Sequence, residues 1–176
     1  MALLFAGSSL AQCCGVSKSR RSFQCGWHDR PGKSPVVQDG KVYMATSDTA
    51  LFHVLDAHTG ASIYSLKFQW PIFGSPAIAG KMLYLAGQDG KLSAVDLSNR
   101  KVAWSFQSDA SLQNLQEHSK ADGSPNYSAA FRSSFYDDML VGISKMHAVG
   151  TILSSPVVSG NVVYVGSADG NLYALE

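Results

Sequence analysis

Residues 75–107, SPAIAGKMLYLAGQDGKLSAVDLSNRKVAWSFQ, form a unit whose order of residue types occurs three times in the chain. Each copy opens with Ser-Pro and two apolar residues, and a turn and then an apolar run containing a tyrosine follow. The copies start at Ser34, Ser75 and Ser155. The first two starts are 41 residues apart, which is the length of one four-stranded propeller blade. The sequence therefore predicts an all-β fold, a β-propeller of four-stranded antiparallel blades.

The outer strand of each blade is predicted where large side chains alternate with small ones, at residues 63–68 and 101–106. Because side chains two residues apart lie on the same face of a strand, each outer strand presents a large apolar face to its neighbour. The members of these faces are Tyr64, Leu66 and Phe68 in the first copy and Val102, Trp104 and Phe106 in the second. We expect Trp104 to be buried as blade packing and not to be the floor of a cofactor site.

Three stretches resemble the PQQ-like repeats of the quinoprotein-type β-propellers, whose motif runs roughly G-x-x-D-G-x-L-x-A-x-D-x-x-T-G-x-x-x-W. They are LDAHTG at 55–60, AVD at 94–96 with Trp104 eight residues on, and SADGNLYAL at 167–175. The resemblance covers residues 34–107 and 150–176. It departs from the motif at Thr49, Tyr64, residues 98–100 and Glu176, which weakens individual turns without changing the architecture that the resemblance implies.

The repeat period fails between the second and third copies, whose starts are 80 residues apart. A decayed fourth blade would place strands here. Apolar residues at steps of four instead indicate one face of a helix, and these are Phe131, Phe135, Met139 and Ile143, followed by His147. We therefore predict an insertion over residues 108–148 with a helix at about 126–146 that packs Phe131, Phe135, Met139 and Ile143 against the propeller.

The chain thus divides into four parts. Residues 1–33 are a signal-like or linker segment, 34–107 two PQQ-like repeats, 108–148 the inserted helical segment and 149–176 a third, incomplete repeat. About three blades make a partial ring, because the third repeat supplies three strands. The unpaired sheet edge that results predicts self-association, and an apolar strand at residues 23–27 is the candidate donor that would cover this edge.

Composition excludes several classes of partner. The formal net charge is +1 and charged residues are 15% of the chain, against a usual value of about 25%, so we expect no nucleic-acid partner. Apolar runs fall short of the roughly 18 residues that span a bilayer. The first twelve residues are signal-like but have no basic start, and the repeats contain no cysteine. These features favour a periplasmic or extracellular protein.

No catalytic or metal site is predicted from residue spacing. The five histidines show no metal-binding spacing, and Asp137 and Asp138 are consecutive and would diverge on a helix. Asp48, Asp89 and Asp169 recur in phase with the repeat, which indicates turn chemistry. The resemblance implies one candidate cofactor pair, Cys13 and Cys14, because quinoprotein alcohol dehydrogenases carry a disulfide between adjacent cysteines over the quinone, with calcium nearby. No calcium-binding set accompanies this pair.

Two main functional classes follow from the sequence. The missing catalytic constellation favours a non-catalytic binding or scaffold domain with protein partners, similar to the periplasmic scaffold of the outer-membrane assembly machinery that the resemblance implies, and with no cofactor. The alternative is part of a PQQ-dependent quinoprotein dehydrogenase, which would need PQQ and calcium. A third reading, with less support, is the propeller tail of an adenylating enzyme.

Overall fold

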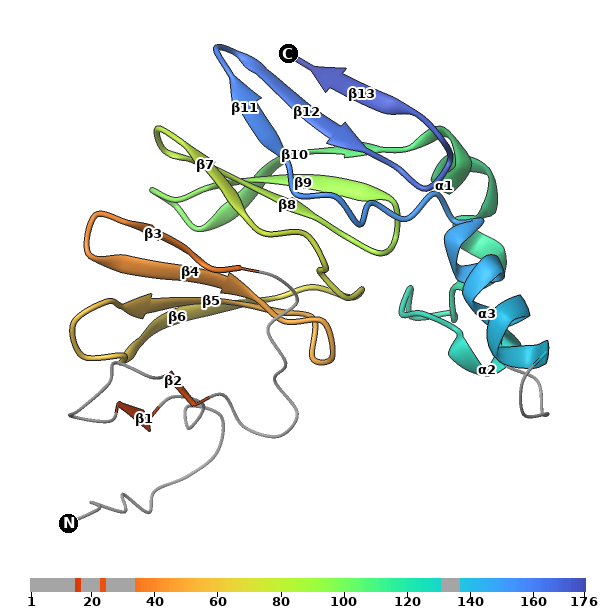
Figure 1. Ribbon diagram of the computed structural model, residues 1–176, viewed down its shortest axis with the longest axis horizontal. Coiled ribbons are helices and arrows are strands. Elements are labelled where there is room, and N and C mark those ends of the chain that lie inside the picture. The colour runs from red at the N-terminus through yellow and green to blue at the C-terminus, as the bar shows by residue number, and fades with distance from the viewer. Residues whose placement is uncertain (1–14, 17–22, 25–33, 131–136) are drawn as a thin grey trace.

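A computed structural model of the chain describes residues 15–16, 23–24, 34–130 and 137–176. In these residues, three larger antiparallel sheets succeed one another like the blades of a propeller (Figure 1). Blade 1 has four strands in the order β3-β4-β5-β6, blade 2 has β7-β8-β9-β10, and blade 3 has β11-β12-β13. The predicted all-β propeller architecture, a partial ring with short helices, is confirmed.

The strands fall where the repeat predicted them, with hairpin turns at the Asp-Gly and Gly positions. Blade 1 comprises β3 (Val36–Gln38), β4 (Lys41–Ala45), β5 (Leu51–Asp56) and β6 (Ser62–Lys67). Blade 2 comprises β7 (Ala77–Ala79), β8 (Met82–Ala86), β9 (Lys91–Asp96) and β10 (Lys101–Gln107). Blade 3 comprises β11 (Val157–Ser159), β12 (Val162–Gly166) and β13 (Leu172–Leu175).

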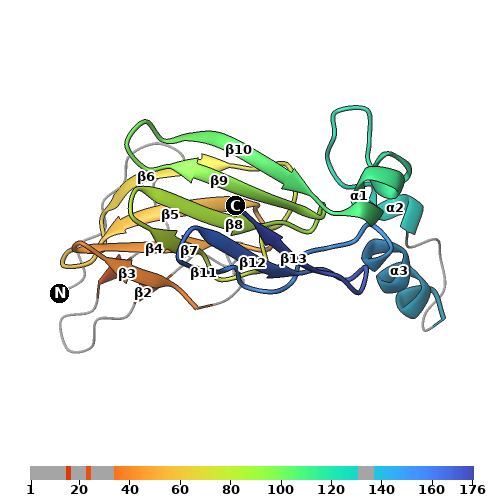
Figure 2. The same cartoon turned by 90° about the horizontal axis from the view of Figure 1, so that it is seen from above.

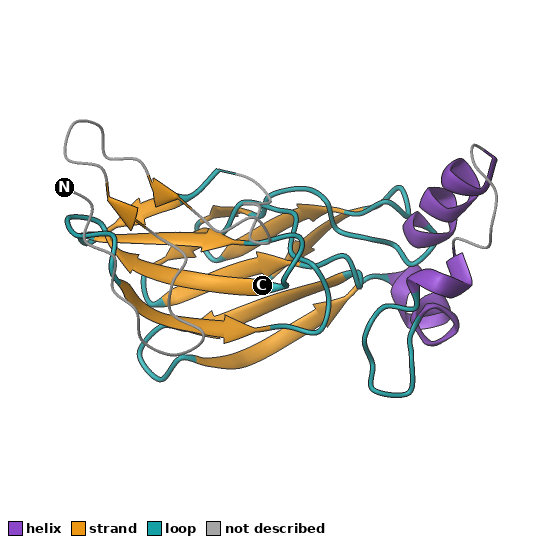
Figure 3. Ribbon diagram, turned by 90° about the horizontal axis from the view of Figure 1, so that it is seen from below, coloured by secondary structure: helices purple, strands orange, loops and turns teal. Residues whose placement is uncertain are grey.

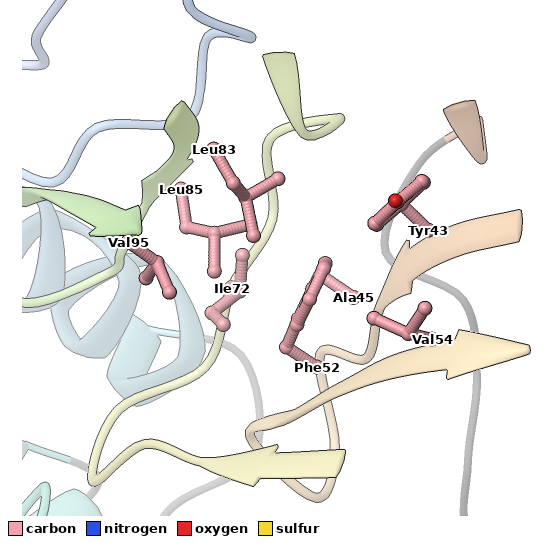
Figure 4. Packing of buried hydrophobic residues seen from close by; sticks show 8 residues of the cluster. All are labelled: Tyr43, Ala45, Phe52, Val54, Ile72, Leu83, Leu85 and Val95. Atoms are coloured by element: carbon pink, nitrogen blue, oxygen red, sulfur yellow. The ribbon is translucent and has the colours of Figure 1, made fainter. Parts of the chain in front are cut away.

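The hydrophobic core lies between successive blades. Side chains from blades 1 and 2 face one another across the first interface (Figure 4), and they are Tyr43, Ala45, Phe52, Val54, Ile72, Leu83, Leu85 and Val95. Tyr64, Leu66 and Phe68 pack against this cluster from the outer side of blade 1, which confirms the predicted face. A second cluster joins blades 2 and 3 and includes Leu92, Ala94, Ile152 and Val165.

The expectation that Trp104 is buried is wrong, since its side chain is 38% exposed. The register between β9 and β10 shifts between Val102 and Trp104, so one extra residue in β10 turns these two side chains to opposite faces. Val102 lies opposite Val95, in the cluster toward blade 1, and Trp104 lies opposite Ala94, in the cluster toward blade 3. The predicted common face of β10 therefore holds only for Trp104 and Phe106.

The exposure of Trp104 also reflects what covers it. Tyr64 occupies the equivalent place in blade 1, and the guanidinium of Arg100, just before the outer strand of blade 2, lies 4.6 Å from its ring centre. Among the described residues, blade 3 has no outer strand that could cover Trp104 in the same way. The ring of Trp104 makes a tilted contact with Tyr84, with the ring centres 6.0 Å apart.

The described N-terminal residues, 15–16 and 23–24, do not complete blade 3. Strand β2 (Phe23–Gln24) pairs with β1 (Gly15–Val16) in a small antiparallel sheet, and β13 is the edge of its sheet among the described residues. The expected donor role is therefore wrong for residues 23–24. A local hairpin closes a far shorter loop than pairing across roughly 150 residues would, so it costs less entropy. Residues 25–27 lie outside the described residues, and self-association stays a prediction.

The insertion carries helices that gather at one end of the blades (Figures 2 and 3). They are α1 (Asp109–Asn114), a 3-10 helix (Leu115–His118), α2 (Tyr127–Ala130) and α3 (Asp137–His147). The sequence predicted helix over α2 and α3 but missed α1 and the 3-10 helix. None of the described helices is both long and apolar enough to cross a bilayer.

The predicted packing of the helical stripe is wrong for Ile143, which is 42% exposed. Phe131, Phe135 and the side chain of Met139 lie outside the described residues. Two other parts of the insertion make the contacts that the stripe was expected to make. They are the turn around residues 120–124 and the first turn of α1.

Candidate functional site

A hollow of about 350 Å³ lies between blades 1 and 2, near their outer strands. We call it the inter-blade groove. One wall comes from the end of β6 and the link that follows it, with Leu66, Lys67, Phe68, Gln69 and Trp70. The rest comes from Ile72 and from blade 2, with Leu85, Gly87, Asp89, Lys91, Ser93, Arg100, Val102 and Ser105.

The groove exists because blade 2 presents small side chains where blade 1 presents larger ones. Ser93 on β9 pairs across the sheet with Ser105 on β10, and Leu85 lies on its other side. The equivalent pair in blade 1, forty residues earlier, is His53 and Ser65, whose Nδ1 and Oγ atoms are 2.7 Å apart. Replacing an imidazole by a hydroxymethyl group leaves space in front of the outer face of blade 1.

Three cationic side chains line the groove. The Lys67 ammonium donates a hydrogen bond to the Thr49 carbonyl, and the Arg100 guanidinium lies over the Tyr64 ring. Lys91 Nζ is 4.0 Å from Asp89 Oδ2. Since Asp89 is the one carboxylate among the lining residues, the groove carries an excess of positive charge at neutral pH.

Asp89 lines the groove beside Lys91. Its Oδ1 accepts the backbone N–H of Lys91 at 3.2 Å, and burial raises the pKa of its carboxyl while nearby Lys91 opposes the rise. A Cβ atom at position 87 would lie 2.4 Å from Asp89 Oδ1, so Gly87 makes room for the carboxylate. The turn role predicted for Asp89 is confirmed, but its place in a groove was not visible from the sequence.

Asp169 in blade 3 makes the same kind of hydrogen bond to the backbone of its turn as Asp89 does in blade 2. Asp169 Oδ1 accepts the N–H of Asn171 at 3.0 Å, and its Oδ2 accepts the Tyr173 hydroxyl at 2.6 Å. These hydrogen bonds, led by the one from Tyr173, offset the cost of burial and lower the pKa of Asp169. Asp89 and Asp169 are therefore turn residues, as their phase predicted.

The insertion is fastened beside the groove by the link between blades 1 and 2. Trp70 is 4% exposed, packs with Leu115 and donates from Nε1 to the Gly123 carbonyl at 2.8 Å. Its neighbour Gln69 donates to the Asp122 carbonyl at 2.9 Å. Two side chains of the link therefore hold two successive carbonyls of one turn, which fixes the insertion as a wall next to the groove.

The two ends of the insertion meet at a buried junction. The Ser108 hydroxyl donates to the Gly150 carbonyl at 3.0 Å, and the Ser108 N–H donates to the Gly90 carbonyl at 2.9 Å. From blade 3, the Ser167 hydroxyl donates to the same Gly150 carbonyl at 2.9 Å. The chain thus leaves blade 2 and returns toward blade 3 at one point, so the insertion is a side branch of the propeller.

The structure does not test the candidate cofactor residues. Cys13 and Cys14 lie outside the described residues, and their role stays a prediction. Among the residues that the structure describes, no three His, Cys, Asp or Glu side chains gather where they could hold a metal ion, so the described residues do not fit a calcium site. The signal that could have revealed the groove is the change from His53 to Ser93 between equivalent positions of the repeat.

Comparison with known proteins places the fold. Residues 16–132 match the family described as outer membrane protein assembly factor BamB, and no curated protein matches the chain. BamB from Moraxella catarrhalis superposes with a TM-score of 0.53 at 14% identity, over 88% of this chain and 37% of that one.

Two further solved structures are less similar. The computationally designed protein Ika4 has a TM-score of 0.49 at 14% identity, over 80% of this chain and 62% of that one. A europium-containing methanol dehydrogenase has a TM-score of 0.48 at 16% identity, over 76% of this chain and 25% of that one. Because the family match spans more than half of the sequence, the chain belongs to the BamB family of PQQ-like β-propeller proteins.

Proposed function

We propose that this chain is a non-catalytic binding domain, a scaffold that holds protein partners in a bacterial-type cell envelope or in a secreted protein, without a cofactor. The inter-blade groove is the observation that carries the proposal, because it is a concave, partly apolar surface with a few fixed polar groups. The family description names outer membrane protein assembly, which supports an envelope setting. The fold also serves enzymes, so the argument depends on the site.

The walls of the groove are suited to binding because they are already fixed. Two of the walls are formed by strands, β6 in blade 1 and β9 with β10 in blade 2, which are held by the hydrogen bonds of their sheets. The adjoining insertion is held by Gln69 and Trp70. A surface that does not have to be ordered when a partner arrives loses less entropy on binding. A groove with hydrogen-bonded walls beside an inserted segment is typical of a docking site.

The first test of this proposal addresses catalysis. After reconstitution with PQQ and calcium, the purified chain is expected to show no dye-linked oxidation of alcohols or sugars. The described residues offer no cluster of calcium ligands, and the quinoprotein reaction depends on a bound quinone. A quinoprotein dehydrogenase reconstituted in the same batch is the positive control. Stoichiometric quinone binding with turnover would contradict the proposal.

The second test addresses the scaffold role. We expect the chain to sediment with vesicles that contain outer-membrane assembly machinery from which the endogenous BamB has been omitted, with saturation as its concentration rises. Vesicles of the same lipids without protein are the control for adsorption to lipid. Equal sedimentation with both vesicle types, or none with either, would contradict a role as a partner of this machinery.

A further inference from the structure

Building on the proposed protein-binding role, we infer that the inter-blade groove binds an extended acidic peptide segment of a partner protein. Lys91 and Arg100 contact the carboxylates of that segment. Leu66 and Phe68 take up an apolar side chain between them. The inference depends on the charge, the shape and the edges of the groove.

The excess of cationic side chains in the groove favours a negatively charged ligand. Lys67, Lys91 and Arg100 line the groove against the single carboxylate of Asp89. The whole chain carries a formal net charge of only +1, so this local excess does not reflect a generally basic protein. Cationic groups at a partly desolvated surface attract carboxylates more strongly than the same groups in bulk water.

The guanidinium of Arg100 is held in position by the protein itself. The Arg100 guanidinium is held 4.6 Å from the ring centre of Tyr64, and Arg100 itself has a left-handed backbone with φ of 62°. Its backbone N–H donates to the Asp96 carbonyl at 2.7 Å. A planar guanidinium held on an aromatic face still offers N–H groups at its edge, which can donate hydrogen bonds to a carboxylate.

Shape indicates an extended peptide. The volume of about 350 Å³ is at the small end of ligand pockets, which run from roughly 300 to 1,000 Å³. Its apolar lining includes the half-buried Leu66 and Phe68 on one side and Val102, 50% exposed, on the other. Side chains of an extended chain point to alternate sides. A segment that alternates acidic and apolar residues can therefore contact the cationic lining with one set of side chains and the apolar lining with the other.

The sheet edges at the groove favour side-chain recognition over simple strand addition. Strands β6 and β10 are the edges of their sheets, and β10 carries the bulge between Val102 and Trp104. A bulge disrupts the regular row of edge donors and acceptors and protects the edge from indiscriminate pairing. Specificity at this surface therefore depends on the groove side chains.

The test is a fluorescence anisotropy titration of the full 176-residue chain with a labelled six-residue peptide that alternates glutamate and leucine. We expect saturable binding that weakens about tenfold when the salt concentration rises from 50 to 500 mM. Arg100→Gln and Lys91→Gln are each expected to weaken binding about five- to tenfold. Lys101→Gln is the matched control, because Lys101 is adjacent in sequence but does not line the groove, and it should change affinity less than twofold.

A further variant separates binding from folding. Ser105 is exposed and lines the groove, so Ser105→Phe should fill the groove and abolish binding while the thermal unfolding curve stays that of the wild type. Equal affinity of the Arg100→Gln variant and the wild type, an equal loss in Lys101→Gln, binding of a lysine–leucine peptide, or displacement by equimolar inorganic phosphate would each overturn the inference.

The two proposals fail separately. If the wild type sediments with the assembly machinery but does not bind the acidic peptide, the groove inference is wrong and the scaffold role stands. If the wild type binds the peptide through Arg100 but does not sediment with the machinery, the groove inference stands and the proposed partner is wrong.

Discussion

Replacing Gly90 with alanine is expected to lower the free energy of unfolding by about 2 to 5 kcal/mol, the sum of two penalties. Gly90 has a φ of +72°, and a Cβ atom there would lie 2.6 Å from Ser111 Cβ, 2.7 Å from Ser108 Oγ and 2.8 Å from the Gly150 carbonyl oxygen. The left-handed backbone costs an L-residue about 1–2 kcal/mol. Overpacking a buried junction costs about 1–3 kcal/mol more.

Gly170→Ala is the matched control for this prediction. Gly170 stands at the same place of the Asp-Gly turn in blade 3 and also has a positive φ, of +89°, but a Cβ atom there would meet nothing within 4 Å. The free energy of unfolding of this variant should therefore fall only by the backbone penalty of about 1–2 kcal/mol. Urea unfolding followed by circular dichroism measures both variants. Equal losses in Gly90→Ala and Gly170→Ala would show that the junction does not constrain the fold.

These two glycines show why the repeat predicted the blades so well and the insertion less well. A repeated Asp-Gly turn has the same local chemistry in every copy, so the strands on either side could be placed from sequence alone. The contacts of Gly90 with Ser108 and Gly150 depend on residues distant in the chain, and nothing in the turn distinguishes it from Gly170. Local patterns determined the strands, and long-range contacts determined which turn is buried.

The errors on side-chain faces have a similar origin. Alternation predicts one face for Val102 and Trp104. In the structure, these two residues lie opposite adjacent residues of β9, so the bulge leaves the residue between them without a cross-strand partner. Such a shift of one residue exchanges the two faces of a strand. For the helical stripe, the step of four correctly predicted helix over its described part, residues 137–147. Periodicity alone does not say which surface covers that face, and Ile143 is exposed.

The groove could not be recognised from the sequence, because it depends on which residues of two blades face one another. Ser93 and Ser105 are unremarkable residues of two strands, and their importance comes from facing Leu66 and Phe68 of another blade. The equivalence of His53 with Ser93 is present in the sequence, forty residues apart. Its meaning depends on knowing that both positions face the same side of their sheets.

The second large effect is expected at Trp70. Trp70→Ala should lower the free energy of unfolding by about 3–5 kcal/mol, because truncating a buried tryptophan loses its apolar contacts and leaves a cavity. The substitution also removes the Nε1 donor of the Gly123 carbonyl, so the turn around residues 120–124 loses one of the two side chains that hold it. Trp70→Phe keeps most of the ring and removes the donor, and we expect it to cost about 1–3 kcal/mol.

Trp104→Ala is the comparison that decides between the pattern in the sequence and the packing in the structure. The repeat motif predicted that Trp104 is buried in the packing of its blade. In the structure it is 38% exposed, and its ring centre lies 6.0 Å from that of Tyr84. Losing such a pair should cost about 0.5–1.5 kcal/mol beyond the loss of the part of its surface that is buried. Urea unfolding of both variants, with the slope of the transition checked against the wild type, measures the difference. A loss in Trp104→Ala equal to or larger than that in Trp70→Ala would mean that blade 3 covers Trp104 in solution, and that the fastening of the insertion by Trp70 contributes little to stability.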